Sequence, residues 1–491
     1  MTATEHTAPG VHAPDQHTGP SSEDGPRKPW TVLVVALVAQ ILVVLDISVV
    51  NTALPSIADS LRLHGGQLQW LVTAYLVMSG GGLLLGGRIA DSLPRRRVFL
   101  TGLSVFTGAS ILSGFARNAN ELIAARAGQG LAAALMTPAA LSLIMTTYSG
   151  DQRRKGLATW GAVGSMGVAA GVLFGGALTT WTGWQSIFWI NGPIGAAALI
   201  AAAKVLPHTS TPKVGLRQFD LPGAVTVLGA LMTLMYVLGT TANAGWLSAH
   251  TVVGFAVSAA LLAAFARIEH RSARPLVPPH TWKVRSLVSG TAVMLGVTGI
   301  LVGAVFLTSI YVQGVLGYSA LRTGVAFLPF AFAITAGAHL ARHLLGRAAP
   351  RTLAVVGLVL TAGAAMLLST ATSGADYASD LLPGLMLLGV GVGMVFVPVS
   401  ISAMAGIPTQ HAGLASGFLM TGHEIGAAFG VAALSAVATT AGSLTTSAAI
   451  VTGYGRGFVA AAILAGLVAI IAWVRMSATP VAAGAGAMHG H

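Results

Sequence analysis

Three charged residues lie deep inside long apolar stretches of this sequence, where an ionised side chain is costly. Asp46 follows the uncharged run TVLVVALVAQILVV, and Arg126 and Glu424 each stand well inside a later apolar segment. An ionised Asp or Arg near the centre of a membrane helix costs about 2.5–3.5 kcal/mol, so such residues face a cavity and pair. Burial favours a neutral carboxyl group, whereas a nearby guanidinium favours the carboxylate. These residues predict a proton-binding carboxyl group at Asp46 beside Arg126; the alternative is a static ion pair that joins two helices.

Glu424 stands in a glycine pattern that predicts its direction. Gly422, Gly426 and Gly430 recur every fourth residue and form one smooth face for close helix packing. Glu424 is two positions from Gly422, about 200° around a helix, so we expect it to point away from that face and into a central cavity. There it would bind a cationic substrate, carry a second proton or pair with the neighbourhood of His423; the alternative is a protonated Glu that only forms a hydrogen bond.

The composition places these residues in a membrane protein. The chain has 491 residues, of which 54% are hydrophobic and 8% charged, against about 25% charged in soluble proteins. Apolar runs of about 20 residues, enough for a helix to cross a bilayer, recur along the sequence and predict an all-α, polytopic membrane protein.

The sequence has no Cys, which excludes disulfides, thiolate metal sites and a Cys nucleophile. It also has no HExxH or GxSxG-with-His pattern, its acids are too sparse for a metal site, and its basic residues fall between the spans. We therefore expect neither an enzyme nor a nucleic-acid-binding protein.

We identify fourteen apolar segments as transmembrane helices. Their approximate limits are 30–53, 68–89, 98–116, 121–146, 156–180, 185–205, 220–241, 250–268, 287–313, 323–342, 352–371, 381–403, 414–440 and 456–475. With the N-terminus inside, 21 of the 26 Lys and Arg residues fall on the cytoplasmic side and 4 outside, with Arg126 within a span. Because Lys and Arg concentrate in cytoplasmic loops, this bias predicts fourteen spans with both termini cytoplasmic.

Weak internal repeats predict two related halves. The sequence GLAT at 156–159 is echoed by GLAS at 413–416, and the basic loop at 86–97 by the loop at 339–351, at nearly one spacing. We expect a disordered cytoplasmic tail at 1–28, a six-helix bundle at 29–205, a linker with two extra transmembrane helices at 206–286, a second six-helix bundle at 287–476 and a disordered tail at 477–491.

Six short motifs occur in order along these segments. They are LDISVVNTALP (45–55), GRIADSLPRRR (87–97), ARAGQG (125–130), GVLFGG (171–176), GWQSIFWINGPIG (183–195) and YVQGVLGYSALRTG (311–324). Together they resemble the fourteen-span drug:proton antiporter branch of the major facilitator superfamily, over nearly the whole chain. Pro94 replaces the glycine of the family's loop motif and Val172 the proline of its fifth span, so neither the family's turn nor its helix kink is expected here.

The resemblance implies the major-facilitator fold and a transport function. It implies proton-coupled efflux, or antiport, of small amphipathic compounds such as antibiotics by alternating access, with the proton gradient as energy source and no cofactor. The implied partners are a small-molecule substrate, protons and the lipid bilayer of a bacterial inner membrane, and the implied state is a monomer. Two alternatives on the same fold stay open: a dedicated exporter of an endogenous metabolite and an uptake symporter.

Pattern and resemblance together assign roles to single residues. Proton coupling falls to Asp46, Arg126 and Glu424. We expect a conformational latch on the cytoplasmic side, formed by Gly87, Asp91, Arg95 and Arg96. The alternative role of the arginines is only to keep this loop on the cytoplasmic side, and the two roles are compatible. Close helix packing falls to Gly167, Gly171, Gly175 and Gly176 and to Gly422, Gly426 and Gly430. Candidates for the substrate cavity are Gln40, Asn51, Tyr75, Gln129, Asn191, Tyr311 and Gln313; for each of them an interface anchor or an interhelical hydrogen bond is an equal alternative.

Overall fold

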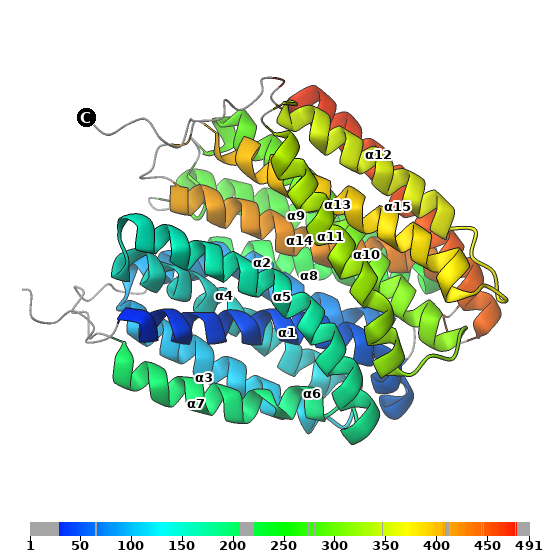
Figure 1. The fold of residues 1–491 in the computed structure, drawn as a ribbon, viewed down its shortest axis with the longest axis horizontal. Coiled ribbons are helices and arrows are strands. Elements are labelled where there is room, and N and C mark those ends of the chain that lie inside the picture. Colours follow the sequence, from blue (N-terminus) through cyan, green and yellow to red (C-terminus); the bar gives the residue numbers. More distant parts are fainter. Residues whose placement is uncertain are drawn as a thin grey trace, which may run out of the picture.

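Every regular element that the computed structural model describes is a helix (Figure 1). The described residues are 29–63, 66–206, 220–272, 275–278, 281–345, 347–405, 407, 412–442, 444, 446–476 and 478. Both predicted tails, 1–28 and 477–491, lie outside this part of the chain apart from residue 478.

Each predicted apolar segment falls on a long helix or, for 185–205, on a short and a longer helix in succession. The helices are α1 (Pro29–Leu61), α2 (Gly66–Ser92), α3 (Arg95–Gly114), α4 (Ala119–Thr147), α5 (Gly150–Thr182), α6 (Ser186–Trp189), α7 (Asn191–Val205), α8 (Leu221–Ala244), α9 (Ala249–Arg271), α10 (Arg285–Gly314), α11 (Ala320–Leu344), α12 (Pro350–Leu368), α13 (Leu382–Met404), α14 (Ala412–Ala438) and α15 (Ser447–Arg475), with short turns η2 (Thr281–Lys283), η3 (Tyr377–Leu381) and η5 (Thr439–Ala441). Among the described residues, thirteen helices are long and apolar enough to cross a membrane. The remaining long helix, α5, has 33 residues and packs along α1.

Two predicted limits were wrong because a helix is longer than its apolar part. The first helix continues through Pro55 to Leu61, where the prediction ended it at residue 53, and Asp46 therefore lies near the middle of α1. A proline removes one backbone donor, but the segment beyond it still packs, since Ile57 is fully buried. The last helix begins at Ser447 rather than 456, because Thr446 caps it by accepting from Ala449 N.

The helices form two packed groups. In the first half of the chain, α2 and α3 pack on α4, α5 on α1, and α7 on α3; in the second half, α14 packs on α10, and α11 and α12 on α13. In Figure 1 the first group, α1 to α7, runs from blue to green, and the second group, α10 to α15, runs from light green to red. The paired helices α8 and α9 stand between them in sequence, and α8 lies against both α2 and α14.

Four helix pairs join the two groups: α1 with α10, α1 with α11, α5 with α11, and α2 with α14. Ser309 Oγ of α10 donates to Asn51 O of α1 at 2.7 Å, and Gln313 Nε2 donates to Thr52 O at 3.1 Å. At the end of α5, Thr180 Oγ1 accepts from the backbone N–H of Leu321 at 3.1 Å. By the predicted topology these contacts close the outer end of the molecule.

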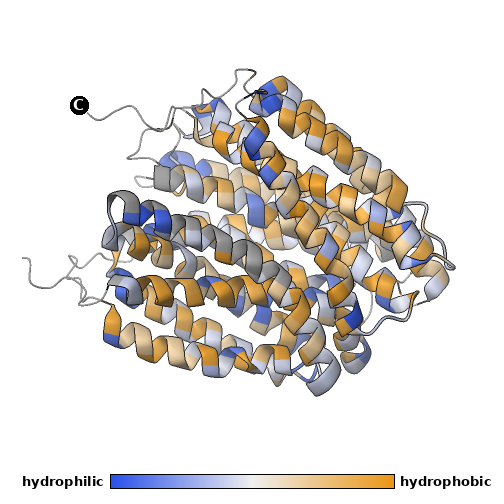
Figure 2. Ribbon diagram, in the orientation of Figure 1, coloured by the Kyte–Doolittle hydropathy of each residue, from blue (hydrophilic) through white to orange (hydrophobic). Residues whose placement is uncertain are grey.

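Large apolar side chains point outward on many helices. Trp181 of α5 is 74% exposed, Val225 of α8 68% and Phe332 of α11 70%. Figure 2 shows hydrophobic residues along most of the length of the helices and hydrophilic residues gathered towards many of their ends. Soluble proteins rarely expose such continuous apolar surface, so these faces contact lipid.

Candidate functional site

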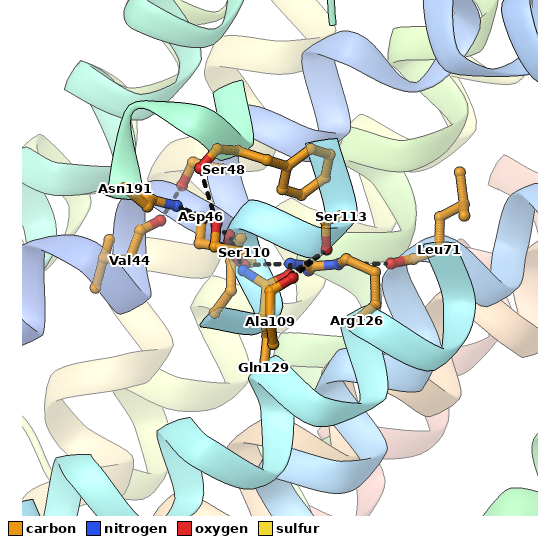
Figure 3. Close-up of polar contacts among 12 residues, drawn as sticks. Val44, Asp46, Ser48, Leu71, Ala109, Ser110, Ser113, Arg126, Gln129 and Asn191 are labelled. Carbon is orange, nitrogen blue, oxygen red and sulfur yellow. Dashed lines mark hydrogen bonds and ion pairs between the residues drawn. The ribbon is translucent and has the colours of Figure 1, made fainter. Parts of the chain in front are cut away.

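Asp46 and Arg126 form an ion pair inside the first group of helices (Figure 3). Asp46 projects from α1 and is 3% exposed, Arg126 projects from α4 and is 1% exposed, and Arg126 Nη1 contacts Asp46 Oδ2. Removing two charges from water costs several kcal/mol per ion, roughly. Such a pair is stable only where further hydrogen bonds surround it.

Amide side chains from two helices supply those hydrogen bonds to Asp46. Gln129 Nε2 of α4 donates to Asp46 Oδ1 at 2.8 Å, and Asn191 Nδ2 at the start of α7 lies 3.5 Å from the same oxygen. Gln129 Oε1 also accepts from Arg126 Nη1 at 3.0 Å. Gln129 therefore touches both charges, and its side chain is fully buried.

Two serines of α3 extend this network, and the sequence analysis missed both. Ser110 Oγ accepts from Asn191 Nδ2 at 3.0 Å and donates to Phe188 O at 3.0 Å. Ser113 Oγ donates to Gln129 Oε1 at 3.2 Å. The available signal was their spacing, since two serines three residues apart in an apolar span lie on one helix face.

Arg126 keeps other partners besides Asp46. Its Nε donates to Leu71 O of α2 at 3.1 Å, and its Cζ lies 4.5 Å from the ring centroid of Tyr75 and 5.9 Å from that of Phe188. Aromatic faces attract a guanidinium. If Asp46 took up a proton and lost its charge, Arg126 would still be stabilised, so the ion pair is able to open without leaving the guanidinium uncontacted.

Glu424 has very different surroundings. Its side chain is 15% exposed, Oε1 lies 3.6 Å from His423 Nδ1, and Oε2 has no hydrogen-bond partner within the described residues. A Cβ at Gly80 of α2 would lie 2.6 Å from the Glu424 Cβ, so only glycine allows α2 and α14 to approach here. No cluster of three or more His, Asp or Glu side chains in the described ranges is placed to hold a metal ion.

The glycine face of α14 packs as expected. Gly422, Gly426 and Gly430 all approach α10, where a Cβ at Gly426 or Gly430 would overlap the backbone of Leu295 or Gly299. Glu424 faces α2 instead, so it lies where the two groups of helices meet.

The glycines of α5 form contacts with two helices. Gly167, Gly171 and Gly175 face Val44, Ser48 and Val49 of α1, respectively, and Gly176 faces the backbone of Ala320 in α11. These glycines therefore pack α5 against α1 on both sides of Asp46, and Gly176 packs it against α11 of the second group.

The predicted cavity residues fall into two sets. Tyr75, Gln129 and Asn191 belong to the buried network around Asp46 and Arg126. The others lie elsewhere: Gln40 is half-buried on α1, Asn51 Nδ2 donates to Ile47 O, Gln313 joins α10 to α1, and Tyr311 donates its hydroxyl to Thr372 O. Gln129, Asn191 and Gln313 each form an interhelical hydrogen bond, which is the alternative role stated for them above.

The predicted latch residues lie at the junction of α2 and α3. Arg96 Nη2 donates to Ala203 O in the last turn of α7 at 2.6 Å, so it bonds a helix end within its own group of helices. Gly87 has open space around it, and Arg95 is half-buried. The side chain of Asp91 lies outside the described part of the structure, so the latch stays a prediction.

Comparisons with known proteins agree with the two-group helical architecture. The model of the Major Facilitator Superfamily matches residues 36–431. The chain is 39% identical over 465 residues to Puromycin resistance protein pur8 of Streptomyces alboniger, covering 91% of each chain. It is 36% identical over 444 residues to Cephamycin export protein CmcT of Amycolatopsis lactamdurans, covering 90% of this chain and 91% of the relative.

A solved structure of a bacterial homologue of the human lysosomal transporter Spinster, in an inward-facing and occupied conformation, shares the fold. Its TM-score is 0.64 at 15% identity, covering 91% of this chain and 97% of that one. The paired helix groups, the lipid-facing apolar surfaces and the family match lead to one conclusion: this chain is a membrane transporter, not an enzyme, and belongs to the Major Facilitator Superfamily.

Proposed function

We propose that this chain exports small amphipathic compounds, of the antibiotic or drug class, in exchange for protons. Two of its relatives bear names for puromycin resistance and cephamycin export, which supports this substrate class. The single observation that carries proton coupling is the buried Asp46–Arg126 pair, enclosed by Gln129 and Asn191. A carboxyl group in that position changes its contacts with α4 when it gains or loses a proton.

The coupling step runs through α1. A proton on Asp46 removes its attraction to Arg126 and loosens α1 from α4. The same helix offers the carbonyls of Asn51 and Thr52 to α10, five and six residues further on, or roughly 8–9 Å along the axis. A shift of α1 therefore weakens the outer contact between the two groups of helices and favours opening to the outside.

The energy for this cycle comes from the proton gradient, without a cofactor. One proton that moves down the membrane potential supplies about 2.3 kcal/mol per 100 mV. That amount exceeds the net worth of an ordinary hydrogen bond, about 0.5–1.5 kcal/mol. One proton per cycle is therefore enough to break an outer contact such as Ser309–Asn51.

The substrate would meet Glu424 on the side of the second group of helices. Glu424 and His423 are both partly exposed, and the ring of Phe396 lies 6.1 Å from that of His423. An acid beside aromatic rings suits a bulky apolar compound that carries a positive charge, and few other fixed charges lie in these helices.

The proposal includes the topology. The chain crosses a bacterial inner membrane fourteen times, with both termini cytoplasmic, as a monomer. Residues 29–205 and 287–476 form the two six-helix bundles, and residues 206–286 form a linker with two extra transmembrane helices.

Transport into inverted membrane vesicles tests the function. With an imposed pH gradient, addition of puromycin to vesicles that contain the chain should release protons and collapse the gradient. A panel of drugs tested against an efflux-deficient host should show resistance to several compounds. Export that stayed fully proton-dependent in the Asp46→Asn variant would contradict the assigned role of Asp46.

The same two assays separate the alternatives. An uptake symporter would move protons in the same direction as the compound, so the pH change would have the opposite sign. A dedicated metabolite exporter would give resistance to one compound class only, across the whole panel.

A further inference from the structure

Tyr75 presents a buried hydroxyl group that the mechanism above does not use. Tyr75 projects from α2 and is fully buried, and its ring lies 4.5 Å from Arg126 Cζ. Its backbone carbonyl packs against Gly130 of α4, where a side chain would overlap it. The hydroxyl has no hydrogen-bond partner among the described residues. An unpaired buried donor is costly, so another arrangement of the helices should supply its partner.

A second unpaired polar atom, a hydrogen-bond acceptor, lies on α14, which also packs on α2. Glu424 Oε2 also has no hydrogen-bond partner within the described ranges, and Glu424 meets α2 at Gly80, five residues after Tyr75. Tyr75 lies within electrostatic range of both Asp46 and Glu424. A fully buried hydroxyl is a poor substrate contact, because no bound compound reaches it without movement of the helices.

We propose that Tyr75 is a positioning residue that links the two acids: its ring holds Arg126 beside Asp46, and its hydroxyl donates to Glu424 when the two groups of helices rock. This inference rests on the proposed proton-coupled export. A hydrogen bond to a carboxylate is about twice as strong as one to a neutral acceptor. Ionised Glu424 would therefore hold the Tyr75 hydroxyl, whereas protonated Glu424 would release it.

The charged and titratable groups around Tyr75 are few. Asp46 comes from α1, Arg126 from α4, and His423 and Glu424 from α14, while α8 carries no acid or base between Leu221 and Ala244. The pH dependence of coupling should therefore respond to Tyr75 mainly through the two acids and His423.

The Tyr75→Phe variant of the full chain tests the link, because it keeps the ring on Arg126 and removes only the hydroxyl. In inverted vesicles we expect puromycin-driven proton release to fall by about fivefold or more and its pH profile to flatten. Puromycin counterflow without a gradient should stay within about twofold of wild type. In the Glu424→Gln background, the added Tyr75→Phe change should have no further effect.

Tyr454→Phe is the matched control. Tyr454 is likewise 1% exposed or less, but it lies on α15, and Thr308 is the polar neighbour of its hydroxyl. Its removal should leave both assays unchanged. Equal coupling in Tyr75→Phe and wild type, an additive loss in the double variant, or a lower melting temperature for Tyr75→Phe alone would each overturn the link. Wild-type vesicles that release no protons would instead overturn the proposed function.

Discussion

Asp46 and Glu424, the two acids deep inside this transporter, differ in their exposure and in their hydrogen-bond partners. Asp46 is 3% exposed and is enclosed by a guanidinium and two amides, whereas the Glu424 side chain is 15% exposed and one of its oxygens lacks a hydrogen-bond partner in the described structure. The enclosed acid is bonded to α4 and α7. Glu424 lies at the junction of α2 and α14, with His423 Nδ1 3.6 Å from its Oε1.

This difference suggests a division of labour between the two halves. In the proposed mechanism, the fully hydrogen-bonded carboxylate of Asp46 would respond to a proton through changes in helix packing. A carboxylate with a free oxygen is able to accept a bond from a ligand or from Tyr75. Substitutions at each acid and in the helices that hold it test whether the two acids differ in this way.

Asp46→Asn should have the largest effect. It leaves Arg126 buried without a counter-charge, and breaking such a pair costs about 3–5 kcal/mol. We expect proton-driven export to fall by about 100-fold and the free energy of unfolding to fall in the same variant. Transport into inverted vesicles and thermal unfolding in detergent check both effects.

Asp59→Asn is the control for this change. Asp59 lies on the same helix but is exposed, so its substitution should leave export and stability near wild type. A similar loss in both variants would show that the negative charge of α1, rather than the pair, matters.

Gly430→Ala should disturb the orientation of Glu424. A Cβ at Gly430 would overlap the backbone of Gly299, so α14 must move away from α10. Overpacking of this kind costs about 1–3 kcal/mol, measurable as a lower melting temperature. Gly417→Ala on the same helix has open space around it and should not destabilise the protein.

Glu424→Gln should impair function while sparing stability. Because Oε2 has no hydrogen-bond partner in the described structure, the unfolding free energy should change by less than about 0.5 kcal/mol. Export of cationic compounds should fall by about tenfold or more, since a hydrogen bond to a charged group is worth roughly 1.5–3 kcal/mol. Export of neutral compounds, measured in the same susceptibility panel, should fall less. A large loss of stability would place Glu424 in the same class as Asp46.

Ser309→Ala should have the smallest effect, on the outer contact between α1 and α10. The lost bond to Asn51 O is worth about 0.5–1.5 kcal/mol, enough to shift the balance toward the outward-open state by about 2- to 10-fold. Spin labels at residues 62 and 322, introduced as Arg62→Cys and Arg322→Cys into this chain without native Cys, would report the separation of α1 and α11. Ser400→Ala removes a hydroxyl that donates within its own helix, to Phe396 O, and should leave the distances unchanged.

Much of the architecture was predictable because it depends on local features. A run of about 20 apolar residues predicts a spanning helix wherever it occurs, and the glycine spacing of α14 predicts a packing face separate from Glu424. The limits of α1 and α15 were wrong because hydropathy measures contact with lipid, while a helix continues as long as backbone bonds and caps allow.

The amino-acid sequence alone required partners for Asp46 and Arg126, because a charge in an apolar helix has few other stable solutions. It did not determine which groups would surround them. Ser110, Gln129 and Asn191 reach the pair only because α3, α4 and α7 pack together, and that packing depends on contacts far apart in the chain. The free hydroxyl of Tyr75 and the free oxygen of Glu424 were decided in the same way, by the position of α2 between α4 and α14.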